Sequence, residues 1–133
     1  MSEAALRDVL AANAAFYRAF AAGDFQAMDA LWARRAPVAC THPGWRALIG
    51  RDAVLASWAA ILSAPERPAI VCFAPHAVLL GETALVLCYE DVGAWLAATN
   101  VFVREDGAWR MVHHHAGPAR DAPAEEPASG RMH

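Results

Sequence analysis

The feature that most constrains the fold is a change in the spacing of apolar residues near the middle of the chain. Up to the segment Ser63–Pro68 apolar residues recur at the helical period, and beyond it they alternate as in β-strands. The first part predicts helices over 2–22, 25–35 and 51–62, with short extended segments over 37–43 and 44–50. Helices followed by an antiparallel sheet predict an α+β domain, with the helices across one face of the sheet.

The second part predicts four strands, joined by short turns into an antiparallel meander: 69–81, 83–92, 94–105 and 108–117. Pro75 breaks the first of these, and Asp106-Gly107 indicates a hairpin between the last two. The bend at Pro75 and the length of the strands predict a sheet that curves around the helices. Such a cone has one open mouth, where a pocket is expected.

A chain of 133 residues is sufficient for one domain with a single core. We expect that domain to cover residues 1–117. Residues 118–133 are rich in proline, alanine and charge and have no apolar face, so they predict a disordered tail.

Composition excludes some classes of function. The formal charge of −3 and the pI near 6.0 give no electrostatic support for nucleic-acid binding. No apolar run approaches the roughly 18 residues that span a bilayer, and a cytoplasmic location is expected. The three cysteines, Cys40, Cys72 and Cys88, are far apart among apolar neighbours, which favours buried thiols in a reducing compartment.

His42 is a candidate catalytic residue because of its place at the end of an expected strand. Pro43 follows it directly and prevents the strand from continuing. A histidine held there can point into the mouth of the cone and act as a general base near neutral pH. The alternative is a turn histidine that is hydrogen-bonded to local backbone.

A pair of adjacent carboxylates and one asparagine on the expected strands give further candidates. Glu90 and Asp91 are adjacent and therefore lie on opposite faces, so only one of them can face the pocket. A carboxyl turned inward has a raised pKa and can hold a proton at pH 7, whereas a solvated strand end is the alternative. Asn100 stands in an apolar strand, where an inward amide needs a hydrogen-bond partner from protein or ligand.

The run His113-His114-His115 has two interpretations. A metal site would receive at most two ligands from it, because alternation separates His114 from the other two. His42 or His76 could supply a third ligand, but nothing in the spacing requires it, and no cysteine or carboxylate stands at a helical partner spacing. We therefore expect no metal and no cofactor. A two-residue hairpin loop places His113 and His115 on the face of Asn100, whereas a three-residue loop places His114 there.

Three stretches together resemble the NTF2-like superfamily in its SnoaL-like branch: Ala21–Trp32, Val38–Val54 and Thr99–Gly117. The likeness runs from about Leu6 to Pro118. It implies an NTF2-like α+β cone with N-terminal helices packed in a strongly curved, antiparallel-rich sheet. It implies no single function, because this scaffold serves isomerases, dehydratases, cyclases and association domains.

Ala74–Glu90 and Thr99–Pro118 also resemble the association domain of calcium/calmodulin-dependent protein kinase II. The pocket arginines of that family fall on Glu90, Asn100 and Ala116, so its anion-binding set is missing. The ketosteroid isomerases are a more distant resemblance.

In the ketosteroid isomerases the catalytic aspartate matches His42 and the oxyanion-binding aspartate matches Asn100. Their tyrosine matches Phe16, with Tyr17 beside it. Because one oxyanion donor is gone, steroid isomerisation does not carry over.

Both families place the residues matching Asn100, Val112, His114 and Ala116 on the concave face. This favours the three-residue loop and turns His113 and His115 outward, onto a convex face that these proteins commonly use for dimerisation. We expect a homodimer through that face. The predicted pocket residues besides His42, Asn100 and His114 are Phe16, Tyr17, Phe20, Trp32, Trp58, Glu90 and Ala116.

The resemblance and the residues together predict binding of a small apolar or carbonyl-bearing molecule. As an enzyme the protein would be an isomerase or dehydratase that needs no cofactor, with His42 as general base and Asn100 and His114 donating hydrogen bonds. The alternative is a non-catalytic association module with a vestigial pocket.

Overall fold

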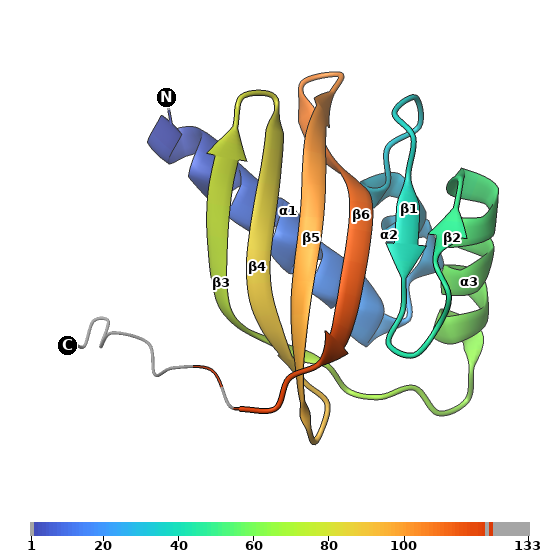
Figure 1. Cartoon of the computed structure of the whole chain (residues 1–133). Coiled ribbons are helices and arrows are strands. Elements are labelled where there is room, and N and C mark those ends of the chain that lie inside the picture. Colours follow the sequence, from blue (N-terminus) through green and yellow to red (C-terminus); the bar gives the residue numbers. More distant parts are fainter. Residues whose placement is uncertain (1, 122, 124–133) are drawn as a thin grey trace.

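The computed structural model describes residues 2–121 and 123 and contains three helices and six strands in this part of the chain. In chain order the elements are α1 (Ser2–Ala22), α2 (Phe25–Leu31), β1 (Ala39–Thr41), β2 (Leu48–Ile49), α3 (Arg51–Ser63), β3 (Val71–Leu80), β4 (Thr83–Asp91), β5 (Trp95–Glu105) and β6 (Ala108–Pro118) (Figure 1). Apart from 118–121 and 123, the predicted tail lies outside the described residues. None of the described helices is long and apolar enough to cross a bilayer.

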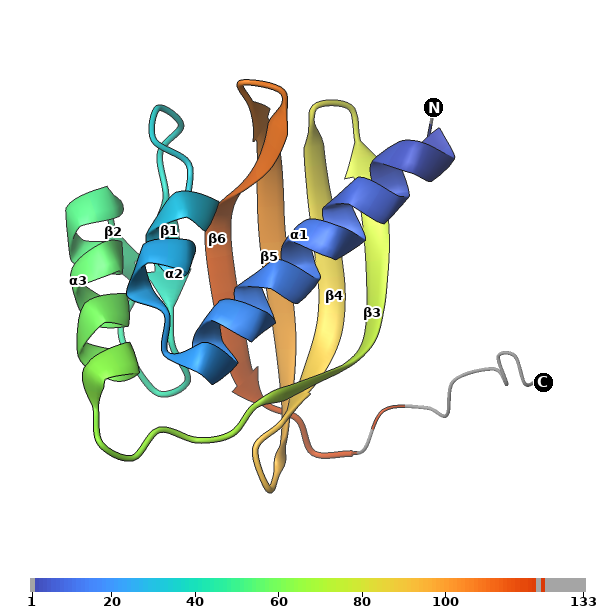
Figure 2. The ribbon, with the colours of Figure 1, turned by 180° about the vertical axis from the view of Figure 1, so that it is seen from behind.

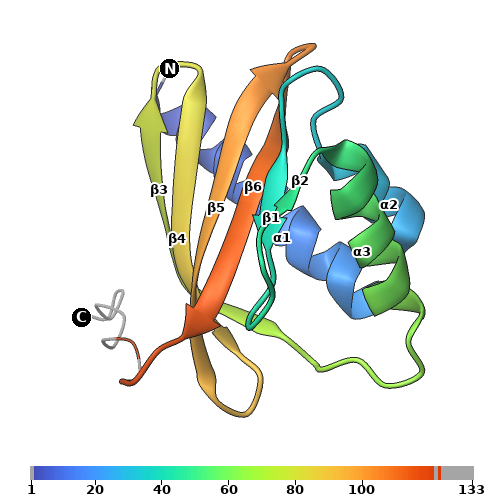
Figure 3. The same ribbon diagram turned by 45° about the vertical axis from the view of Figure 1, so that its right-hand side comes forward.

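The strands form one sheet in the order β2-β1-β6-β5-β4-β3. The last four make the predicted antiparallel meander, and β1 adds to it in parallel beside β6. Helix α1 crosses the concave face of this curved sheet, while α3 lies beside β1 and β2 (Figures 2 and 3). The α+β cone expected from the sequence is confirmed.

The local sequence explains the corner between α1 and α2. Gly23 adopts a left-handed φ of +64°, which glycine accepts without steric cost, and so ends α1. The side chain of Asp24 then accepts a hydrogen bond from the backbone N–H of Ala27 at 3.0 Å and caps α2.

Helix α2 ends at Leu31, four residues earlier than the apolar spacing predicts. Trp32 is extended, with φ −86° and ψ 142°, and forms a parallel bridge with Met111. The N–H of Ala33 donates to the carbonyl of Met111 at 2.9 Å. The pairing of Trp32 with β6 therefore replaces the last helical turn that the sequence predicted. This pairing places the Trp32 side chain in the core, where it is fully buried.

The predicted break at Pro75 is wrong, since β3 continues through it. A β-bulge between Phe73 and His76 absorbs the proline, and Ala74 there has a φ of +56°. Because β3 is the outer strand of the sheet, a residue without an N–H is tolerated.

The three-residue hairpin loop is also wrong. Glu105 pairs with Ala108, and the two loop residues Asp106 and Gly107 have positive φ angles of 55° and 77°, as a type I′ turn requires. A β-bulge further along leaves Val112 without a partner. The bulge shifts the register by one residue, so that Asn100 still lies opposite His114.

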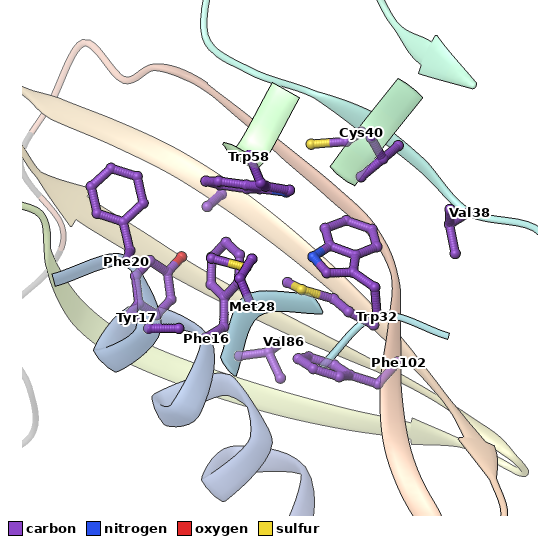
Figure 4. Close-up of a cluster of buried hydrophobic side chains, with 14 of the residues drawn as sticks. Phe16, Tyr17, Phe20, Met28, Trp32, Val38, Cys40, Trp58, Val86 and Phe102 are labelled. Atoms are coloured by element: carbon purple, nitrogen blue, oxygen red, sulfur yellow. The ribbon is translucent and has the colours of Figure 1, made fainter. Parts of the chain in front are cut away.

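The core fills the space between the helices and the concave face of the sheet. Figure 4 shows Trp32 among Met28, Val38 and Phe102, and all four side chains are at most 4% exposed. Burying a phenylalanine such as Phe102 contributes about 2 kcal/mol. This dense end of the cone contrasts with the other end, where the cavity described below lies.

Two charged side chains hold the segment around the end of α2, one from β5 and one from α3. Both carboxylate oxygens of Glu105 accept backbone N–H bonds, from Arg34, Arg35 and Ala36, each at 2.9 Å. These bonds lower the pKa of Glu105 to about 2. Arg51, at the start of α3, donates to the carbonyl oxygens of Trp32, Ala33 and Asp29 and to the Asp29 carboxylate.

We predict that Glu105→Gln lowers the melting temperature by several degrees, because an amide can accept through only one of its two polar atoms. Since the folded pKa of Glu105 lies below its usual value, its contribution is present above about pH 4.5 and is lost as pH falls towards 2. The melting difference between wild type and variant should therefore shrink in acid. Thermal unfolding followed by circular dichroism between pH 2 and pH 7 measures it, and a constant difference would contradict the prediction.

Candidate functional site

A cavity of about 400 Å³ lies between α1, α3 and the concave face of the sheet. Its walls are mainly apolar and include Phe16, Phe20, Trp45, Trp58, Ile61 and Leu96. Its polar lining residues are Tyr17, His42, Glu90 and His114. Among the described residues that line it, none is an arginine.

Most of the predicted pocket residues meet at this cavity, but three do not line it. Trp32 is fully buried at the dense end of the core, and Ala116 is 2% exposed. Asn100 is also fully buried and lies behind the lining, where it contacts other polar side chains. Figure 4 shows Phe16 and Phe20 of α1 facing Trp58 of α3 across the cavity end of the core.

The strand end and turn at Pro43 position His42 as the sequence suggested. The hydroxyl of Ser57 donates to the carbonyl of Val54 at 2.6 Å, so it can only accept from His42 Nε2 at 2.8 Å. His42 thus carries its proton on Nε2 and has a bare Nδ1. The thiol of Cys40 lies 3.9 Å from Nδ1, a weak contact. Burial lowers the pKa of His42 to about 4, which keeps the ring neutral at physiological pH.

His114 is held by a chain of amides. Asn100 donates through Nδ2 to Asn13 Oδ1 at 2.8 Å and to the Tyr17 hydroxyl at 3.2 Å. Its Oδ1 therefore faces His114 Nδ1, at 2.6 Å, and accepts the proton of that nitrogen. Burial, and repulsion from the neighbouring histidines when they are charged, lower the pKa of His114 to about 3. His114 is consequently neutral, with its lone pair on Nε2.

Glu90 supplies the carboxyl group of the cavity and is 2% exposed. Burial raises its pKa, an effect opposed by the hydrogen bond that Tyr17 donates to Oε2 at 2.6 Å. His114 Nε2 lies 4.0 Å from Oε2. This contact is not an ion pair, because His114 is neutral. The rings of His42 and His114 are 6.4 Å apart, with Trp58 beside both.

Sequence reasoning missed two residues that position the histidines. Asn13 holds Asn100, and Ser57 holds His42. Both are buried polar residues on helical faces that are otherwise apolar. A polar residue at an apolar position of a helix is therefore the feature that could have identified them.

The two outer histidines of β6 lie close to each other. His113 and His115 lie with their rings 6.1 Å apart, and His113 Nδ1 is 3.0 Å from the carbonyl of Ala39. Within residues 2–121 and 123, no three histidine, cysteine or carboxylate groups are arranged to hold a metal ion.

Comparison with known proteins agrees with this architecture. Residues 9–121 match the family model of the SnoaL-like domain. The chain belongs to this family. A curated relative of this SnoaL-like domain is the F-box protein SKIP8 of Arabidopsis thaliana, 28% identical over 116 residues. The match covers 85% of this chain, which spans about half the length of the relative.

Two solved structures are similar in both sequence and fold. A candidate dehydratase of the NTF2-like family from Streptomyces avermitilis is 36% identical, with a TM-score of 0.84 over 91% of this chain and all of that one. A candidate calcium/calmodulin-dependent protein kinase type II association domain from Thiobacillus denitrificans is 38% identical, with a TM-score of 0.70 over 83% and 94% of the two chains.

We predict that His42 makes the domain less stable in acid. Its folded pKa of about 4 lies below the value of about 6.5 in the unfolded chain, so the unfolded state binds more protons between these pH values. Stability attributable to this residue falls by about 3 kcal/mol as pH drops from 7 to 4.

The measurement is the difference in unfolding free energy between wild type and His42→Gln at each pH, from urea titrations. Taking the difference removes the pH-dependent contributions to the unfolding free energy that both proteins share, including that of Glu90. His115→Gln, at an exposed position of β6, is the control. A wild-type minus His42→Gln difference that does not vary with pH would rule out the lowered pKa.

Proposed function

We propose that this SnoaL-like domain binds a small, uncharged and mostly apolar molecule, carrying one carbonyl or hydroxyl group, in the cavity between α1, α3 and the sheet. The observation that carries this proposal is the meeting of two neutral histidines and a buried carboxyl in an apolar cavity that no arginine of the described residues lines. A carboxylate or phosphate would lose its hydration there without gaining a cation.

The size of the cavity supports a small ligand. Its volume of about 400 Å³ is near the lower end of the usual range for small-molecule sites. Aromatic side chains such as Phe16 and Trp58 offer faces and edges against which a ring can pack. Trp45, 47% exposed beside His42, is suited to cover an occupant at the mouth.

As a catalyst the site would act through His42. The bare Nδ1 can take a proton from carbon, and the carboxyl of Glu90, with its raised pKa, can give one to oxygen. In a dehydration the C–H electron pair becomes the new C=C bond while the C–O bond breaks and the hydroxyl leaves as water. In an isomerisation the same groups would move a proton between two carbons by way of an enol.

The sequence predicted that Asn100 and His114 donate hydrogen bonds to the ligand, but their hydrogen bonds within the protein favour other roles. Both amide protons of Asn100 are already used, and the Nδ1 proton of His114 goes to Asn100. In this proposal Asn100 is a positioning residue, and Glu90 replaces it as the donor to a ligand oxygen. Similarity to the candidate dehydratase supports an enzyme of this kind.

The second candidate function is a non-catalytic association module. The outer face of the sheet carries apolar side chains that a second copy could cover, among them Phe73 and Leu80 on β3 and Leu87 on β4, between 37% and 56% exposed. Similarity to an association domain supports this alternative. A homodimer through this face is compatible with both functions. The cytoplasmic location expected from the sequence stays a prediction.

We predict that uncharged ketones, enones and alcohols raise the melting temperature of the domain, whereas carboxylates of the same carbon skeleton do not, because binding to the folded state alone stabilises it. For a stabilising ketone, His42→Gln should slow exchange of its α-protons in D₂O by about a hundredfold or more. Proton NMR of the ketone measures this rate.

His115→Gln serves as the matched control and should exchange at the wild-type rate. Unchanged exchange in a folded His42→Gln protein would refute the role of the base. If no uncharged compound stabilises the domain while a stable assembly forms, the association function replaces the binding function.

We predict that Leu87→Glu weakens self-association at least tenfold, because a carboxylate would be buried in the contact between two sheets. Analytical ultracentrifugation over a range of concentrations measures the dissociation constant. Phe25→Glu, at a 37% exposed apolar residue of helix α2, is the control and should associate like wild type. An unchanged dissociation constant for Leu87→Glu would remove the outer face as the contact.

A further inference from the structure

The inner end of the cavity holds two hydrogen-bonding atoms that face each other without touching. Oε2 of Glu90 on β4 and Nε2 of His114 on β6 are 4.0 Å apart. This separation is too long for a direct hydrogen bond. Between their strands runs β5, where the small and buried Ala98 pairs with both Cys88 and Ala116. Both polar residues line the cavity, so a ligand atom can reach the gap between them.

The hydrogen bonds behind the cavity decide what His114 offers to this gap. Asn13 Oδ1 can only accept, so the Asn100 atom that faces it at 2.8 Å is the amide nitrogen. The same nitrogen donates to Tyr17 Oη, which itself donates to Glu90. The remaining Asn100 atom, Oδ1, therefore accepts the Nδ1 proton of His114 at 2.6 Å. Nε2 is left as an acceptor without a proton.

Glu90 offers the opposite character. Oε2 accepts the Tyr17 hydroxyl at 2.6 Å, and burial favours the protonated carboxyl, whose pKa is raised. In its protonated form the carboxyl can donate into the gap, and the imidazole nitrogen on the other side can accept.

We propose that the gap between Glu90 and His114 binds a hydroxyl group of the ligand in preference to a carbonyl group. An oxygen at a normal hydrogen-bond length of about 2.8 Å from both atoms fits a separation of 4.0 Å. A hydroxyl there accepts from Glu90 and donates to His114. This inference rests on the proposed binding function and narrows its ligand to alcohols, phenols or enols.

A carbonyl oxygen satisfies only one side of the gap. It can accept from Glu90, but it has no proton to donate to His114. A lone pair of the carbonyl oxygen then faces the lone pair of His114 Nε2 in a buried site. An unmade hydrogen bond of this kind weakens binding roughly tenfold or more. The network of Asn13, Asn100 and Tyr17 keeps His114 from exchanging its proton to Nε2, because that exchange would leave Asn100 Oδ1 unpaired.

Matched compounds test this directly on the wild-type protein. The probes are 1-indanol, 1-indanone and indane, with cyclohexanol, cyclohexanone and cyclohexane as a smaller set and 1-tetralol, 1-tetralone and tetralin as a larger one. Isothermal titration calorimetry gives each dissociation constant. We expect the alcohol of any set that binds to bind at least tenfold more tightly than its ketone, and the hydrocarbon to bind no better than the ketone.

Variants then assign the preference to the gap. His114→Phe keeps a planar side chain but removes the acceptor, so alcohol and ketone should bind within about threefold of each other. Glu90→Gln keeps a carbonyl oxygen that accepts from Tyr17 and leaves His114 Nε2 to accept from a hydroxyl, so it should retain the preference for alcohol. His115→Phe, the outward neighbour, is the matched control, and circular dichroism checks that each variant is folded.

The outcomes separate this inference from the function on which it rests. A ketone that binds the wild-type protein as tightly as its alcohol overturns the hydroxyl preference and leaves the binding function standing. A retained preference in folded His114→Phe also overturns the assignment to this gap. If no alcohol, ketone or hydrocarbon of the three sets binds, the proposed binding function fails and the inference fails with it.

Discussion

One extra residue in β6, Val112, sets the direction of every side chain that follows it. Successive residues of a strand point to opposite faces, so the bulge reverses the facing that the two-residue hairpin loop alone would impose. With it, His114 lies opposite Asn100 inside the cone, and His115 is on the outer surface. Without it, His113 and His115 would face inward, and neither the amide chain nor the gap beside Glu90 would exist.

The cavity depends in turn on limiting the charge of its ionisable groups. Two histidines, a carboxyl and a tyrosine share a small apolar space, where a net charge without a partner is expensive. Burial resolves this by lowering the pKa values of both histidines and raising that of Glu90. The hydrogen bonds then fix where each remaining proton sits. The two histidines therefore contribute oriented dipoles and no charge to the site.

Periodicity was sufficient to predict the order of helices and strands, because each element buries one face. It could not predict how α2 ends, since the early stop at Leu31 comes from pairing between Trp32 and Met111, which are far apart in sequence. Strand alternation predicted that only one of Glu90 and Asp91 can face the pocket, but it could not decide which. The facing of His114 followed from the family resemblance, while the loop length inferred with it was wrong, because a bulge leaves no local mark in the sequence.

The same limit applies to the site. His42 could be predicted as a site residue because the signal is local: Pro43, the next residue, stops its strand. The expectation that a histidine of β6 faces inward likewise needed only the alternation within one strand. The partners of these residues come from helices: Ser57 from α3 and Asn13 from α1. Their identity depends on how α1 and α3 lie across the sheet, which periodicity does not specify.

The bulge at Ala74 and Pro75 has a consequence for how copies of this chain can meet. It lies on β3, whose free edge would otherwise present a continuous row of backbone donors and acceptors to another strand. The proline removes one donor, and the left-handed residue before it twists the row out of line. At the opposite edge β2 has only two residues, too few to template a neighbour. Both edges therefore resist extension of the sheet from one molecule to the next, which protects this apolar chain against growth into open-ended aggregates.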